Sequence, residues 1–244
     1  MPRGTLRNPP FQQPVMREAQ SMIPPLPVAI RSCLTDAAQR LGRALNELEW
    51  PSGGKDAAPA EINALINLMF YLQSQPAPFA IYAEGTCEDG RIDMMACDGE
   101  VALAVEAKNF GAIQRQSEAA LRDLNRMLKF RPSLGLLRSG EAPRPWWGDA
   151  KQRWGIILIQ SFRGKEIADA WQSPDDNAFQ QHMSAYRSAA DRLQTDVQGE
   201  PAGFHKLFRA FPAHNRGIAP ITDGQRWADC GQGWFLWGAV PLQA

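Results

Sequence analysis

The chain has 244 residues, of which 44% are hydrophobic and 21% charged, and its formal net charge at pH 7 is zero. This composition is ordinary for a globular protein, and no stretch approaches the roughly 18 apolar residues that a transmembrane helix needs. The N-terminal residues contain no apolar signal core, so we expect a cytoplasmic protein without a membrane partner. The four cysteines are too widely spaced for a zinc site, which fits free thiols in a reducing compartment.

The first half of the chain predicts an arm, two helices and three strands. Residues 1–28 are rich in proline and predict a surface arm. Apolar residues at helical spacing predict helices over 29–50 and 59–73, and the inward stripe of the second is expected to contain Ile62, Leu65, Ile66, Met69 and Leu72. Asp-Gly pairs separate three apolar runs and favour hairpins. The strands are expected over 79–86, 91–97 and 101–108.

The second half predicts fewer elements. A helix over 114–130 should turn Leu121, Leu124 and Leu128 inward, and the short apolar run over 155–162 suits a buried strand. A long loop is expected between them. One helix is expected over 166–198, and a last strand over 234–240.

This order of elements predicts an α/β fold. Its mixed sheet would consist of a three-stranded antiparallel meander and a further strand, flanked by helices. We expect a core with its preceding helix over 29–165, and a C-terminal extension of helices and a short strand over 166–244, packed on that core.

The hairpins predict which strand residues share a face. A two-residue loop at Asp98-Gly99 places Asp93 opposite Ala104 and puts Asp93, Glu106 and Lys108 on one face of the sheet. The opposite face then collects only apolar residues, namely Ile92, Met94, Ala96, Val101, Leu103 and Val105. The same rule applied at Asp89-Gly90 places Thr86 opposite Asp93 and adds Glu84 to the acidic face. Two carboxylates that approach each other repel unless a cation lies between them, although solvated acids or a structural Glu106–Lys108 ion pair remain alternatives.

Charge is unevenly distributed along the chain. Residues 47–100 contain ten acidic and two basic residues, whereas residues 108–165 contain twelve basic and four acidic residues. An acidic block beside a basic block suits a metal site next to a polyanion, and solvated surface is the alternative interpretation.

The segment Arg91-Ile92-Asp93, followed by a hairpin and by Val105-Glu106-Ala107-Lys108-Asn109, resembles the PD-(D/E)xK nuclease superfamily. The resemblance covers roughly residues 59–162, including the order of elements, although Ile92 stands where the family's proline would be. It implies a restriction-endonuclease-like core. It also implies Mg²⁺, which Mn²⁺ could replace, held by Asp93, Glu106 and the backbone carbonyl of Ala107, with Lys108 orienting or deprotonating the attacking water.

The resemblance also implies a further acid from the preceding helix. Glu61 is the candidate, and Glu84 is the alternative. A glutamate in the first turn of a helix is favoured by the helix dipole whatever its function.

For nucleic acid the candidates are Gln114, Arg115 and Arg122, with Arg126 and Lys129 farther along the same helix; a solvated helix face is the alternative.

The expected function is a Mg²⁺-dependent endonuclease that acts on DNA. By analogy with the family it would serve bacterial defence, as a homodimer or as a subunit of a defence complex. A nucleic-acid-binding module with a degenerate nuclease fold and an exported toxin nuclease are alternatives, and an RNA substrate remains open.

Overall fold

The computed structural model of the protein describes residues 23–47, 61–87, 90–110, 113–129, 150–161, 165–192, 202–221 and 233–242. These residues form six α-helices and one six-stranded mixed sheet, and none of the helices is both long and apolar enough to cross a membrane. The strands are β1 Ala80–Cys87, β2 Gly90–Cys97, β3 Val101–Asn109, β4 Gln152–Ser161, β5 Arg216–Pro220 and β6 Trp234–Pro241. The helices are α2 Val28–Glu47, α3 Glu61–Gln73, α4 Ile113–Lys129, α5 Lys165–Gln172, α6 Asp176–Arg192 and α7 Ala202–Ala210, with a 3-10 turn η2 over Ala213–Asn215.

The sheet has the strand order β1-β2-β3-β4-β6-β5. β1, β2 and β3 form the antiparallel meander that the sequence predicts, and β4 pairs with β3 in parallel. A parallel pair needs a long crossover connection, and α4 lies in the chain between β3 and β4. The α/β class and the meander with its further strand are therefore confirmed.

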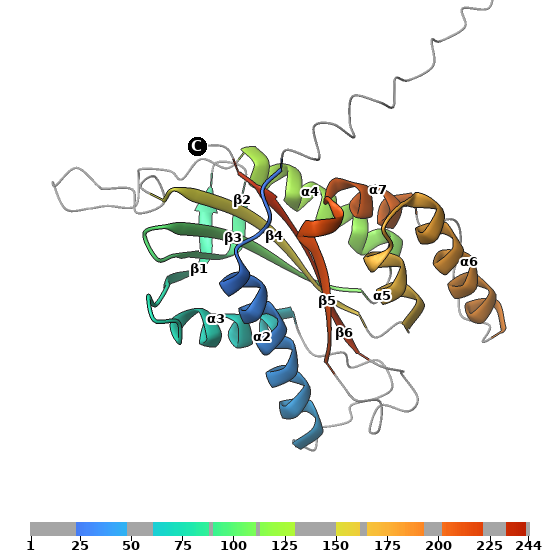
Figure 1. Ribbon diagram of the computed structural model, residues 1–244, viewed down its shortest axis with the longest axis horizontal. Coiled ribbons are helices and arrows are strands. Elements are labelled where there is room, and N and C mark those ends of the chain that lie inside the picture. Colours follow the sequence, from blue (N-terminus) through green and yellow to red (C-terminus); the bar gives the residue numbers. More distant parts are fainter. Residues whose placement is uncertain are drawn as a thin grey trace, which may run out of the picture.

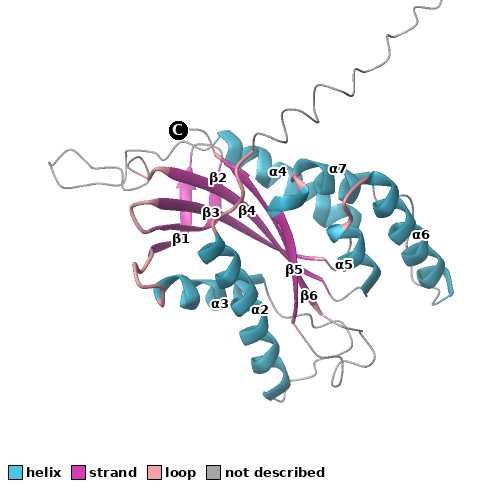
Figure 2. Ribbon diagram, in the orientation of Figure 1, coloured by secondary structure: helices cyan, strands magenta, loops and turns pink. Residues whose placement is uncertain are grey.

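Helices cover both faces of this sheet (Figure 1). α2 and α3 share one core cluster with Leu103, Val105 and Ala107 of β3. α4, α5, α6 and α7 share a second cluster with Ala102 and Ala104 of the same strand. Figure 2 shows the strands between these two groups of helices. Because successive strand residues point to opposite faces, a strand buried on both sides is a continuous apolar run, as β3 and β4 are.

The predicted inward stripes of two helices are partly wrong. On α3, Ile62 and Ile66 are exposed, and Leu68 is buried in the core instead. On α4, Leu128 is exposed and Met127 is buried. Both corrections rotate the buried face by about one residue position, because contact with the sheet decides which of several apolar neighbours turns inward.

The chain after residue 165 departs from the single helix expected over 166–198. It forms α5 and α6, which are separated at Ser173-Pro174, because proline lacks an N–H and disfavours helical backbone at the preceding residue. The strand expected over 234–240 is confirmed as β6, whereas α7 and β5 were not predicted. β5 and β6 extend the same sheet beyond β4, so this part of the chain completes the sheet.

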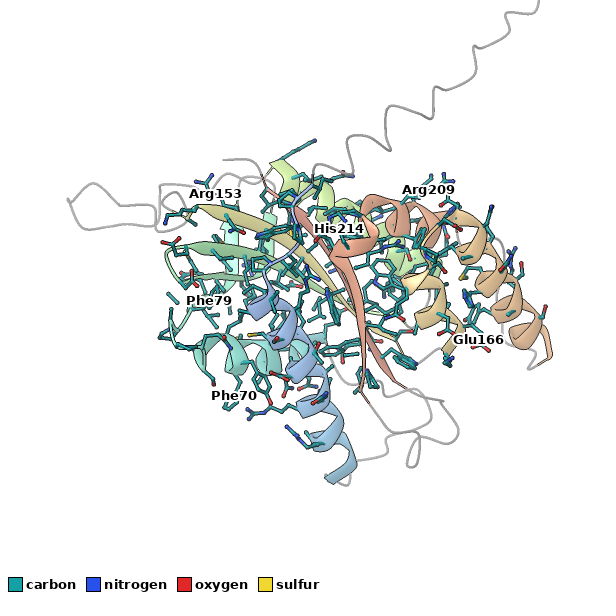
Figure 3. All side chains as sticks on the ribbon, in the orientation of Figure 1. Phe70, Phe79, Arg153, Glu166, Arg209 and His214 are labelled. Carbon is teal, nitrogen blue, oxygen red and sulfur yellow. The ribbon has the colours of Figure 1, made fainter. Side chains whose placement is uncertain are left out.

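The segment before α2 is held by η2. The Leu26 N–H donates to Oδ1 of Asn215 (2.7 Å), and Nδ2 of Asn215 donates to the carbonyl of Pro24 (2.9 Å). Nε2 of His214, which Figure 3 labels, donates to the carbonyl of Ile23 (2.9 Å). Two residues distant in sequence thus anchor the end of the expected arm, of which residues 1–22 lie outside the described part.

The predicted strand register is wrong by two residues in both hairpins. Ala104 pairs with Met95, not with Asp93, and Thr86 pairs with Arg91, not with Asp93. A shift of two residues preserves the alternation of side chains, so the expected face for Glu106 and Lys108 is unaffected by it.

The turn between β2 and β3 explains its shift. Oδ1 of Asp98 accepts the N–H groups of Glu100 (2.9 Å) and Val101 (2.7 Å), and Gly99 has a φ of 94°. The aspartate side chain therefore caps the turn from its first position, and the two central residues are Gly99 and Glu100. The equivalent turn between β1 and β2 involves residues 88–89, which lie outside the described part.

Candidate active site

Glu106 and Lys108 project from β3 toward α4. Their strand neighbours Ala102 and Ala104 belong to the core cluster on the α4 side. Glu106 is almost fully buried, with 1% of its side chain exposed, and 12% of the Lys108 side chain is exposed. Lys108 donates to Oε2 of Glu106 at 3.4 Å. A buried carboxylate and ammonium at the end of a central strand need charge partners, so their surroundings decide what they do.

Asp93 lies where β2 separates from β3. The paired register of the two strands ends at Met94 and Val105. Beyond it, Oδ2 of Asp93 accepts the backbone N–H of Ala107 at 2.9 Å and so takes the place of a strand partner. The sequence predicts Ile92 and Met94 on the same face of β2. In the structure Ile92 belongs to the core cluster on the α4 side and Met94 to the cluster on the opposite side, so the alternation of β2 is broken at this point. The separation of the strands thus brings the Asp93 carboxylate to the Glu106-Ala107-Lys108 segment.

Glu61 reaches the same end of β3 from the opposite face of the sheet. It is the first residue of α3, and its Oε1 accepts the backbone N–H of Asn109 at 2.8 Å. Two carboxylates therefore bond alternate N–H groups of β3, on either side of Lys108.

Glu84 lies elsewhere. Its carboxylate pairs with Arg91 at 3.0 Å, and both side chains are exposed to solvent. Nothing in these contacts supports Glu84 as the alternative acid. Its backbone has a φ of 54°, and the paired register of β1 and β2 skips the position of Glu84 and Asp93.

Two α4 residues complete the charge cluster around Glu106. Asp123 binds Nζ of Lys108 at 2.9 Å and Nη2 of Arg126 at 3.0 Å. Nη2 of Arg126 also binds Oε1 of Glu106 at 2.5 Å. Asp123 was not predicted as a site residue, and Arg126 was considered only as a surface contact. The only sequence signal for this pair is the i,i+3 spacing of Asp123 and Arg126, with Asp123 directly before the inward Leu124.

Family models, curated proteins and solved structures gave no match to this chain. The chemistry of the site must therefore be judged from its own residues.

The electrostatics of the cluster are dominated by Glu106. Burial above all, and then the negative charges of Asp93 and Asp123, raise the pKa of Glu106 from 4.5 to about 7, against the opposing effects of Lys108 and Arg126. The two cations thus leave the carboxylate incompletely compensated. Additional positive charge at this place would be favourable.

Lys108 is held as an ammonium ion. Burial acts to lower its pKa, but the hydrogen bond and charge of Asp123, with the charges of Glu106 and Asp93, outweigh burial and raise the pKa above its ordinary value. In this arrangement Lys108 is a fixed positive charge at neutral pH.

The oxygen atoms of the site residues are of the kind that bind a small divalent cation. Among the described residues, no three His, Cys, Asp and Glu side chains are arranged to hold a metal ion. The set predicted here needs only two carboxylates, Asp93 and Glu106, with one backbone carbonyl. The N–H and C=O of a strand residue point to the same edge, so the carbonyl of Ala107 faces the side on which Asp93 binds its N–H. Oxygen ligands alone are what Mg²⁺ prefers.

The three predicted nucleic-acid contacts differ in their surroundings. Arg115 and Arg122 are exposed on the outer side of α4. Gln114 is partly buried between helices, where its Oε1 accepts the N–H of Gly203 at 3.0 Å and its Nε2 donates to Glu118. Gln114 therefore has a structural partner at the start of α7, while the two arginines face solvent.

Proposed function

We propose that the protein is a Mg²⁺-dependent nuclease of the PD-(D/E)xK type that hydrolyses phosphodiester bonds in DNA. The order α3-β1-β2-β3-α4-β4, with β3 and β4 parallel, supports this proposal, since it agrees with the restriction-endonuclease-like core that the sequence resemblance implies.

One observation carries the proposal. Glu106 is buried at the end of a central strand, its charge is undercompensated, and Asp93 bonds the next residue of the same strand. A purely structural ion pair gains little from two further carboxylates beside it, because each raises the free energy of the charged Glu106. A site that binds a cation gains from all of them.

Each residue then has a defined task. Asp93, Glu106 and the Ala107 carbonyl would hold Mg²⁺, which supplies a bound water of lowered pKa and polarises the phosphoryl oxygen. Lys108 is a fixed cation that orients water and stabilises negative charge on the phosphate. Its raised pKa favours this role over that of a base. Glu61 fixes the end of β3 through Asn109 and so positions Lys108.

The outer side of α4 is the proposed contact for the nucleic-acid backbone. Arg115, Arg122 and Lys129 follow one another at intervals of seven residues and are all exposed, so they form one row along the helix. Cations on this row would attract phosphates without reading sequence.

A binding module without catalysis is the second candidate. Arg126 and Lys108 bind the two carboxylate oxygens of Glu106 and reduce its need for a metal. In that case the cluster would be a structural network beside a basic helix.

Replacing Lys108 with Ala separates the two candidates. Cleavage should fall by about 10²–10⁴-fold, which is typical of the loss of one positioned catalytic group. DNA binding should change little, since affinity that depends on several phosphate contacts falls in small steps. Purified protein would be incubated with plasmid, linear and single-stranded DNA and with RNA, in Mg²⁺, Mn²⁺ or EDTA, and binding would be measured in Ca²⁺.

Lys151→Ala is the matched control, because Lys151 is an exposed lysine paired with Glu100 away from the cluster. Asp93→Asn retains an oxygen that can accept the Ala107 N–H, so it should fold and lose cleavage, with partial rescue by Mn²⁺. Equal cleavage by wild type and Lys108→Ala would refute this active site. Binding without cleavage by the wild type would establish the binding module.

A further inference from the structure

Arg126 occupies one oxygen of the carboxylate that the proposed nuclease needs for its metal. Glu106 has two oxygens, and each is bonded to a cation, Oε1 to Arg126 and Oε2 to Lys108. Because only 1% of Glu106 is exposed, a divalent ion reaches it only by displacing one of these partners.

Arg126 is the partner that can leave. Lys108 has 12% of its side chain exposed and emerges from the central strand, whereas 23% of the Arg126 side chain is exposed and its long stem comes from a surface helix. Gly90 lies beside it, and a β-carbon at that position would touch Arg126, 3.8 Å from Cδ and 3.9 Å from Nη1. The absence of a side chain there leaves room around the guanidinium.

The formal charges favour a divalent ion at Glu106. Asp93, Glu106 and Asp123 carry three negative charges, and Lys108 and Arg126 carry two positive charges, which leaves the cluster at −1. With Mg²⁺ in place of Arg126 at Glu106, and Arg126 still paired with Asp123, the cluster becomes +1 and attracts a polyanion. The exchange removes one of the two anionic partners of Arg126, so its guanidinium can bind a further anion beside Asp123.

A nucleic-acid substrate would supply that further anion. Arg126 lies one helical turn after Arg122 and one turn before Lys129, both of which are exposed. A guanidinium released from Glu106 at this position joins their basic row at its point nearest the cluster. Arginine binds phosphate with two parallel hydrogen bonds, which suits it for this contact.

We propose that Arg126 is an exchangeable residue that binds Glu106 in the free protein and a backbone phosphate of the nucleic acid when Mg²⁺ replaces it. Metal and nucleic acid then bind cooperatively, and linkage requires that each tightens the other by the same factor. This inference rests on the proposed function, because it needs both a metal and a polyanionic substrate.

The first test titrates Mg²⁺ into the protein without nucleic acid, by calorimetry. Arg126→Gln removes the competing cation and should bind Mg²⁺ about tenfold more tightly than wild type, since the metal no longer has to displace a bound group. Arg122→Gln is the control on the same helix and should bind Mg²⁺ as wild type does. Arg126→Lys keeps the positive charge but lacks the paired N–H donors of arginine, so its Mg²⁺ affinity should lie between those of wild type and Arg126→Gln. It replaces Arg126→Gln in the comparison if that variant does not fold.

The second test measures DNA binding as a function of salt, with and without Ca²⁺. Arg126→Gln should reduce the slope of log affinity against log salt by about one unit with Ca²⁺ present, and leave it unchanged without the metal. Arg122→Gln should reduce the slope in both conditions.

The outcomes separate this inference from the proposed function. Suppose that wild type cleaves DNA and that wild type and the two Arg126 variants bind Mg²⁺ with equal affinity. This result overturns the exchange of Arg126 but leaves the proposed nuclease function standing. A loss of slope at Arg126→Gln that does not depend on the metal also overturns it. If neither wild type nor Arg126→Gln binds Mg²⁺, the proposed function fails and the exchange fails with it.

Discussion

Replacing Glu106 with Gln should stabilise the protein strongly at pH 8 and by less than about 1 kcal/mol at pH 5. In the folded protein the pKa of Glu106 is raised from 4.5 to about 7, first by burial and then by the charges of Asp93 and Asp123. The folded state therefore binds this proton more tightly than the unfolded state does. Stability from the protonated form is complete below pH 4.5 and is lost as the pH rises through 7.

The size of the effect follows from the pKa difference. Each pKa unit corresponds to about 1.4 kcal/mol, so wild type should lose about 3 kcal/mol of unfolding free energy between pH 4.5 and pH 8 through this one group. A glutamine has nearly the shape of the protonated acid and cannot ionise. Glu106→Gln should therefore lack this loss and exceed wild type by about the same amount at pH 8.

Urea unfolding at pH 5, 6, 7 and 8, without divalent metal, measures both curves. Glu100→Gln is the control, because it removes the same charge from an exposed side chain. Mg²⁺ at pH 8 should stabilise wild type and not Glu106→Gln, since a ligand that binds only the folded state raises its stability. Parallel pH curves for wild type and Glu106→Gln, or a less stable variant at pH 8, would refute the reasoning.

Two further predictions concern stability away from the site. Gly238→Ala places a β-carbon 2.4 Å from Cδ2 of the buried Phe211 ring, so it should lower the free energy of unfolding, measured with urea, by about 1–3 kcal/mol. Gly155→Ala is the control and should lower it less, because the nearest contact of its β-carbon is the end of a flexible side chain at 3.1 Å. Equal losses in the two variants would contradict the overpacking. The hydrogen bond from Arg209 lowers the pKa of Asp176 to about 2. Because the pair is half exposed and screened by solvent, Asp176→Asn should reduce the free energy of unfolding at pH 7 by only about 0.5 kcal/mol. This difference from wild type should shrink as the pH falls from 3.8 toward 2, and a difference independent of pH would contradict the prediction.

Much of the fold was predictable because periodicity is a local property of the chain. Spacings of three to four residues and the Asp-Gly pairs gave α2, α3, the meander and α4 within a few residues of their observed bounds. The break at Pro174 follows from equally local rules, because proline disfavours helical backbone at the preceding residue. β5 was not readable, because a five-residue edge strand with glycine and proline has no periodic signal and forms only by pairing with β6.

The sequence by itself determined the identity of the candidate residues and the face of Glu106 and Lys108. Strict alternation along β3 fixes that face even when the register is wrong by two residues. The short spacing from Glu106 to Lys108 also keeps these two side chains adjacent in any strand.

Only the tertiary structure decided how these residues are charged and bonded. The bonds of Asp93 to Ala107 and of Glu61 to Asn109 depend on where β2 separates from β3 and on how α3 packs. Arg126 reaches Glu106 because α4 crosses β3 at that level. Hydrogen bonds and desolvation act over a few ångströms between groups 14 to 48 residues apart in the chain, and no pattern of neighbouring residues encodes such distances.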